Sequence, residues 1–196
     1  MSKLALSGVP EADRLLSEDP LALLIGMVLD QQIPLEHAFH SPHELTQRLG
    51  RRPSAEQLAS FDPDELAAIF AKPRALHRFP GSMAKRVQDM CRVVVEEYGG
   101  DAAAVWTGAA SGDELLKRVA ALPGFGQQKA KIFVALLGKQ LEVRPKGWRE
   151  ASAPYGEART KMSIADITSP KTLLEVRDYK RAMKAEAKAR AATAAE

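Results

Sequence analysis

Residues 121–134 read ALPGFGQQKAKIFV, a short glycine-containing turn that leads directly into an apolar helical pattern. Gly124 and Gly126 permit positive φ angles and the close approach of another backbone. The helix that follows has unpaired amides and a partial positive charge at its first turn, which together favour an anion. Lys129 and Lys131 add charge to the same segment. The stretch can therefore hold a DNA phosphate without reading a base, although a plain corner between two helices would have the same pattern.

The composition of the chain is compatible with several classes of protein and excludes a few. The chain has 196 residues, enough for one domain with an arm, and its formal net charge of +3 permits a nucleic-acid partner without establishing one. The single cysteine, Cys91, lies among apolar residues at helical spacing, and we expect it to be buried. One thiolate excludes an iron–sulfur cluster held by four cysteines of this chain. We see no signal peptide and no apolar run of ~20 residues, so we expect a cytoplasmic protein without a membrane partner, nucleoid-associated if bacterial.

Apolar residues recur at spacings of three and four, which predicts an all-α helical bundle. The most apolar segment, DPLALLIGMVLDQQ at 19–32, predicts a central core helix with Asp19 as its N-cap. A second helix is expected to begin at Ser41 and to end at Gly50, because Pro42 should interrupt a helix that started earlier. Further helices are predicted within 62–71, 82–98, 111–122, 127–138 and 169–183, with an ordered loop at 142–160.

The predicted domain organisation is a helical domain at 1–169 followed by a C-terminal helix with a basic tail at 170–196. The helical domain contains a helix–hairpin–helix at 113–137. Residues 184–196 have high helix propensity but little to bury, so we expect them to fray.

Three stretches occur in an order and at separations that resemble the helix–hairpin–helix DNA glycosylases: LLIGMVLDQQ at 23–32, FPGSMAKRVQDMCRVVVEEYGG at 79–100 and LPGFGQQKAKIFVALLGK at 122–139. This is the HhH-GPD superfamily, which includes endonuclease III, the adenine-mismatch glycosylases and the alkyl-base glycosylases. The sequence resembles an actinobacterial branch of it. The resemblance covers roughly residues 20–138 and implies the HhH-GPD helical fold and a role in base excision repair.

The resemblance also assigns DNA-binding residues. The hairpin amides would hold a phosphate, often with a monovalent Na⁺ or K⁺ at the carbonyls of Leu122 and Gly124. One side chain of the glutamine turn would enter the space left by a flipped base, and Gln32 matches better than Gln31; a polar helix end is the alternative. Flipping is required because a glycosylase cannot reach C1′ inside a stacked duplex. The full predicted set is Leu122, Pro123, Gly124, Phe125, Gly126, Gln128, Lys129, Gln31 and Gln32.

Two departures from the family pattern bear on catalysis. Bifunctional members carry a lysine just inside the second hairpin helix that attacks C1′. The matching residue here is Gln128, and Lys129 is expected about a quarter-turn away, which disfavours lyase activity. Active relatives carry an aspartate shortly after this helix, where this sequence has Pro145 or Lys146. An insertion could bring Asp166 to that place, so Asp166 is the candidate catalytic carboxylate; an ordinary capping acid is the alternative.

Two other groups of residues were weighed. Trp148, Tyr155 and Lys146 are candidates for a base pocket, because aromatic side chains can stack on an extruded base; a loop pinned by its aromatics is the alternative. The three histidines His37, His40 and His43 are spaced by three, but zinc is not expected because Pro42 should break the helix that would align them.

The sequence therefore predicts a monomeric base excision repair protein that binds double-stranded DNA. Its most direct activity would be that of a monofunctional DNA glycosylase, which hydrolyses the bond to a damaged or mismatched base without lyase activity and with no cofactor beyond the hairpin ion. The alternative is a catalytically inactive protein of the same fold that recognises duplex or damaged DNA.

Overall fold

The computed structural model describes residues 4–193, with side chains through Arg190, and it is all-α over this range. The helices are α1 (Pro10–Glu18), α2 (Pro20–Leu29), α3 (Leu35–Leu49), α4 (Ala55–Ser60), α5 (Pro63–Ala71), α6 (Pro80–Tyr98), α7 (Gly112–Ala120), α8 (Gln127–Gln140), α9 (Trp148–Ala151) and α10 (Pro170–Thr193), with 3₁₀ turns η1 (Ala102–Val105) and η2 (Ile164–Asp166). Among the described residues, no helix is long and apolar enough to cross a bilayer.

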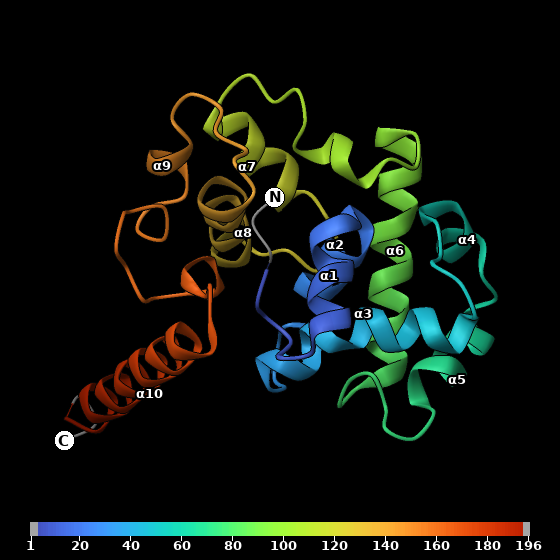
Figure 1. The fold of residues 1–196 in the computed structure, drawn as a ribbon, viewed down its shortest axis with the longest axis horizontal. Helices are drawn as coiled ribbons and strands as arrows, with labels where there is room; N and C mark the ends of the chain where they lie inside the picture. The colour runs from blue at the N-terminus through green and yellow to red at the C-terminus, as the bar shows by residue number, and fades with distance from the viewer. Residues whose placement is uncertain (1–3, 194–196) are drawn as a thin grey trace.

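Helix α2 forms the centre of the core, as its sequence predicts. Every residue from Leu21 to Leu29 is buried, and the helix packs against α1, α3 and α6. Asp19 caps its N-terminus, since the carboxylate accepts the amides of Leu21 and Ala22. In Figure 1 the helices α1 to α6 form one half of the molecule, α7 to α9 form the other, and α10 projects from it.

Helix α3 corrects one prediction. It begins at Leu35 and runs through Pro42, so Ser41 is not an N-cap. The Ser41 hydroxyl lies inside the helix and hydrogen-bonds the carbonyl oxygens of His37 and Leu76, each at 2.8 Å. An internal proline costs about 3 kcal/mol in a helix. Burial of the flanking core residues, including Phe39 against Gly26 of α2, offsets that cost.

The C-terminal third also differs from expectation. Residues 142–160 include the short helix α9, and Trp148 packs so closely on α8 that a Cβ added to Gly138 would lie 2.3 Å from its ring. Helix α10 continues to Thr193, ten residues past the point where we expected fraying, and Glu186 pairs with Arg190 one turn on. Residues 194–196 of the predicted tail lie outside the described range.

Candidate functional site

The turn between α7 and α8 presents open backbone amides. Leu122 and Phe125 are buried and anchor the turn, while the Phe125 amide donates to the Leu122 carbonyl at 3.0 Å. Gly124 has φ +91°, which strongly favours glycine. Gly126 is the exposed N-cap of α8 and offers no side chain to the first-turn amides. The N-terminus of α8 is therefore available to an anion such as a phosphate.

The carbonyl oxygen of Leu122 keeps a lone pair after accepting from Phe125, because a backbone oxygen has two. This free lone pair is compatible with a monovalent cation at the carbonyl oxygens of Leu122 and Gly124, and the cation site stays a prediction.

The glutamine turn after α2 holds its two side chains differently. Gln31 is fixed, since its amide nitrogen donates to the Val28 carbonyl at 2.9 Å and its amide oxygen accepts from Arg86 at 3.2 Å. Gln32 is exposed and has φ +56°, and its side chain has no hydrogen-bond partner among residues 4–193. Strained non-glycine residues of this kind cluster at functional sites. The geometry thus favours Gln32 over Gln31 as the projecting residue.

Arg86 of α6 links this turn to the hairpin. Its side chain bonds Gln31, and its Cδ would lie 3.1 Å from a Cβ added to Gly124. The exposed guanidinium adds a positive charge beside the open amides of the hairpin turn. Sequence reasoning missed it, because one basic residue on an amphipathic helix gives no distinguishing signal.

A cavity of about 560 Å³ lies between the glutamine turn, the N-terminal part of α8 and α10. Such a volume is typical of small-molecule sites, which span roughly 300–1,000 Å³. Its walls combine polar, aromatic and thioether side chains from α2, α8, the 155–162 loop and α10. The lining residues are Met27, Asp30, Gln31, Gln32, Gln128, Lys129, Ile132, Tyr155, Met162, Tyr179, Lys180 and Met183.

Asp30 supplies a carboxylate to this cavity. It is the C-cap of α2, where the helix macrodipole disfavours negative charge. Burial raises the pKa of Asp30, and the nearby cations Lys180 and Lys129 only partly oppose that effect. Its carboxylate has no hydrogen bond or ion pair within 4 Å to any described side chain. An acid held in such an unfavourable place is a candidate functional group.

The sequence did contain a signal for Asp30 that we missed. It is the first charged residue after an entirely apolar helix, at the end where an acid opposes the dipole. We assigned Gln31 and Gln32 to a DNA-contacting turn and looked for the carboxylate only downstream of the hairpin.

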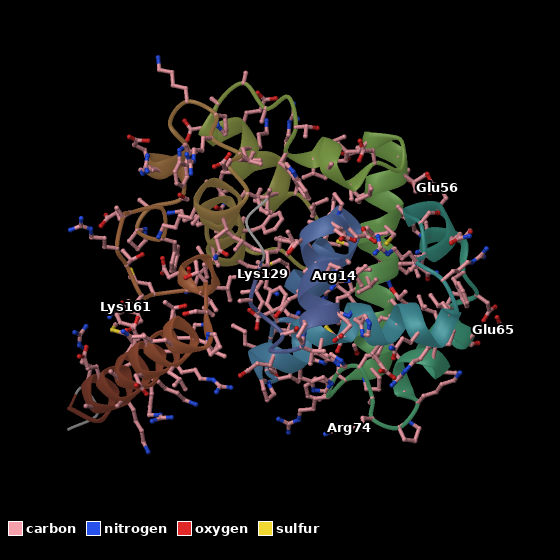
Figure 2. The ribbon with its side chains drawn as sticks, in the orientation of Figure 1. Arg14, Glu56, Glu65, Arg74, Lys129 and Lys161 are labelled. Carbon is pink, nitrogen blue, oxygen red and sulfur yellow. The ribbon has the colours of Figure 1, made fainter. Side chains whose placement is uncertain are left out.

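Lys129 points into the same cavity. Figure 2 labels Lys129 between α8 and α2. Its ammonium group donates to the carbonyl oxygens of Met27 and Val28, at 2.7 and 3.3 Å, near the C-terminal end of α2. Burial lowers the pKa of Lys129 to about 8, although Asp30 acts in the opposite direction. Gln128, its neighbour, reaches the other wall and donates to the Tyr155 hydroxyl at 2.9 Å.

Two of the three base-pocket candidates lie elsewhere. Trp148 is buried against Gly138 and does not line the cavity, which corresponds to the alternative of a pinned loop. The Lys146 carbonyl accepts the Gly112 amide at 2.8 Å, at the start of α7. A nine-residue helix places that point ~13 Å from the hairpin. Of the three, only Tyr155 lines the cavity.

Asp166 also lies outside this cavity. Its carboxylate accepts the amides of Met162 and Ser163 and pairs with Lys139 at 2.7 Å. Lys139 is near the C-terminus of α8, the end away from the hairpin. These contacts make Asp166 a capping and ion-pairing acid, the alternative considered for it. Asp166 does not line the cavity, and it contacts one lining residue, Met162, through that residue's backbone amide.

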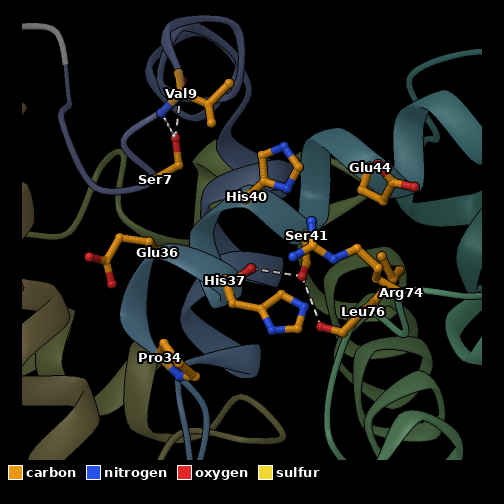
Figure 3. A pocket seen from close by; sticks show the side chains of 10 residues that line it. All are labelled: Ser7, Val9, Pro34, Glu36, His37, His40, Ser41, Glu44, Arg74 and Leu76. Atoms are coloured by element: carbon orange, nitrogen blue, oxygen red, sulfur yellow. Dashed lines mark hydrogen bonds between the residues drawn. The ribbon is translucent and has the colours of Figure 1, made fainter.

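His37 and His40 of α3 line a second cavity, of about 600 Å³ (Figure 3), and His43 is not among its lining residues. The helix runs through Pro42, so the three do share one helix, contrary to the expected break. His37 hydrogen-bonds the Ala75 carbonyl at 3.0 Å, and burial lowers the pKa of His40. Within residues 4–193 no three histidine, cysteine or acidic side chains are placed to hold a metal ion.

Cys91 is fully buried, and burial raises the pKa of its thiol to about 12. It is a core residue of α6, as expected from its apolar neighbours, and its thiol is held in the un-ionised form at neutral pH.

Comparison with known families adds an independent observation. The model of the HhH-GPD superfamily base excision DNA repair proteins matches residues 25–194, which span the glutamine turn, the hairpin and α10. Neither the curated proteins nor the solved structures compared with the chain gave a match. The match covers most of the chain and includes the open hairpin that the geometry identifies. The protein therefore belongs to the HhH-GPD superfamily of base excision DNA repair proteins.

Proposed function

We propose that this DNA-binding repair protein is a monofunctional DNA glycosylase whose catalytic carboxylate is Asp30. The observation that carries the proposal is the position of Asp30, which lies in the cavity between the hairpin helix and the glutamine turn. Family membership accounts for DNA binding and repair, and a desolvated carboxylate with a raised pKa supports chemistry at that place.

The residues divide into three roles. The α8 N-terminus and Arg86 hold backbone phosphates, and Gln32 fills the space in the duplex from which a base has turned out. The extruded base enters the cavity beside Tyr155 and Tyr179, whose rings supply apolar surface for it.

The reaction is hydrolysis of the N-glycosidic bond. The C1′–N bond breaks, its electron pair leaves with the base, and a water oxygen bonds to C1′. Asp30 stabilises the positive charge that develops on the sugar and accepts the water proton, which then neutralises the departing base. A raised pKa makes this carboxylate a stronger base than a solvated one.

Lys129 has a supporting role in this scheme. Its ammonium group is occupied by two carbonyl oxygens of α2, and at a pKa of about 8 it is mainly protonated at neutral pH. The position of the lyase lysine in the bifunctional members is Gln128 here, whose amide cannot form a Schiff base, and the Lys129 nitrogen is engaged by the two carbonyl oxygens. We therefore propose base release without strand cleavage.

The test is incubation of the protein with duplexes that carry uracil, alkylated purines, oxidised bases or mismatches. The proposal expects at least one base to be released, leaving an abasic site that is cut only after alkali. Asp30→Asn should stop release and keep duplex binding. The control Asp64→Asn, an exposed acid in the first turn of α5, should keep both. Duplex binding with no release across the panel would favour the inactive alternative instead.

A further inference from the structure

Helix α10 is attached to the fold only by its first half. Val176 is its last buried residue, and from Lys180 through Arg190 every side chain is exposed. Figure 1 shows the helix extending away from the body toward the C-terminus. A helix that buries so little of its own surface on the chain leaves most of it available to another molecule.

The net positive charge of the protein lies on this helix. Its sequence contains seven lysines and arginines against three acids, a net charge of +4. The whole chain has a net charge of +3, so the rest of the chain is slightly acidic, at −1. Long-range attraction to a polyanion must therefore come largely from α10.

Three of its lysines form an unpaired stripe. Arg177, Arg181 and Arg190 each pair with an acid, Glu36, Asp178 and Glu186 respectively. By contrast, Lys180, Lys184 and Lys188 form no ion pair with the side chains that the structure describes.

Residues four apart share one face of a helix, and like charges at that spacing destabilise it. The stripe is ~12 Å long, and an external anion would remove the repulsion along it.

The stripe begins at the candidate site. Lys180 lines the cavity with Asp30 and Gln32, and the other two lysines continue outward along α10. A duplex with one base in the cavity would carry about one negative charge per 1.7 Å of its axis on either side of that base. The stripe is complementary to that charge, and it begins at the cavity.

We propose that the lysine stripe of α10, Lys180, Lys184 and Lys188, binds phosphates of the duplex that flanks the base in the cavity. The inference rests on the DNA binding in the proposed function and not on base release. It makes α10 a second anchor that adds affinity and salt dependence without sequence preference.

The test uses Lys184→Gln/Lys188→Gln, which leaves the cavity residue Lys180 in place. The matched control, Arg51→Gln/Lys72→Gln, removes the same charge from exposed positions. Arg51 follows the C-terminus of α3 and is ~22 Å along that helix from Glu36, the partner of Arg177. Affinity for a fluorescein-labelled undamaged duplex is measured across salt concentrations of about 50 to 200 mM.

Each lost phosphate contact should make the slope of log K against log salt less negative by ~0.9, so the stripe variant should change it by about 1.8. The control should keep the wild-type slope, and Lys184→Glu/Lys188→Glu should weaken binding further. Glutamine is a good helix former, and circular dichroism checks that α10 persists. A wild-type slope for the stripe variant, or an equal change in the control, would overturn the proposal.

Base release separates this inference from the proposed function. At saturating protein, the stripe variant should release a base as fast as wild type, because it alters no cavity residue. If wild type releases no base but the slope changes as expected, α10 remains a DNA anchor and the glycosylase proposal fails. If release occurs and the slope is unchanged, only the α10 proposal fails.

Discussion

Replacing Asp30 with asparagine should stabilise the fold while removing activity. The pKa of Asp30 is raised by burial even with Lys180 and Lys129 nearby, so the ionised form is disfavoured in the folded state. A group whose folded pKa lies above its unfolded value loses stability as pH rises through the folded pKa. The penalty for ionising Asp30 therefore grows as pH rises from the unfolded pKa to the folded pKa. Asparagine has nearly the same shape and no charge, so it removes that penalty.

The magnitude follows from the position of the acid. A charge that opposes the macrodipole at a helix end costs about 0.3–1 kcal/mol. For a chain of this size, 1 kcal/mol shifts the melting temperature by roughly 2–4 °C. We therefore expect Asp30→Asn to melt about 1–4 °C higher than wild type at neutral pH. The difference should shrink as pH is lowered towards ~4, where the unfolded carboxyl also takes up a proton.

Thermal unfolding followed by circular dichroism at several pH values provides the assay. Asp64→Asn is a control for which the opposite change in melting temperature is expected. Asp64 lies at the N-terminal end of α5, where the helix dipole favours an acid. It should lower the melting temperature slightly at neutral pH. A lower melting temperature for Asp30→Asn would show that the carboxylate holds the fold together, and the reasoning from burial and helix polarity would be refuted.

Three other substitutions probe the account. Asp166→Asn should destabilise the protein by about 2–4 kcal/mol in urea unfolding, because it breaks a buried ion pair, and should leave base release at saturating protein unchanged; a large loss of release would return Asp166 to the catalytic candidates. The stability of wild type should rise with pH from about pH 8 upward, since the folded pKa of Lys129 lies below its unfolded value. Lys129→Met should abolish that rise. A rise that persists in the variant would have to come from another group. Gly138→Ala should lower the free energy of unfolding by about 1–3 kcal/mol, because its Cβ would collide with Trp148. The control Gly81→Ala has open space around it and should change that free energy by less than about 0.5 kcal/mol. Equal effects of the two substitutions would contradict the packing described for α8.

Most of the predicted helices were recognised from residues at or next to their ends. Asp19 and Asp62 cap the helices that their sequence predicts, and Gly50 and Gly99 end theirs in the left-handed conformation. These features depend on neighbours within four residues, so a single sequence displays them. Pro42 misled the analysis for the same reason, since its local cost is outweighed by burial against distant residues.

The candidate site was harder to predict because its walls come from distant segments. The hairpin and Gln32 were visible as motifs. The contact of Lys129 with α2 joins residues about a hundred positions apart, and the pairing of Asp166 with Lys139 depends on how the 142–166 segment folds back. Asp30 is visible in the sequence as the acid that follows an apolar helix. Its proposed catalytic role depends on the cavity, which the packing of α8 and α10 creates.

The most direct test of the account is the single-turnover rate of base release at saturating protein, for wild type and Asp30→Asn on the same lesion-bearing duplex. Saturation removes differences in DNA affinity, so the ratio reports the chemical step. With Asp30 as the catalytic carboxylate, we predict a loss of about 10²- to 10⁴-fold, with duplex affinity retained. A rate within about twofold of wild type would contradict the assignment of Asp30 and of this cavity as the place of reaction.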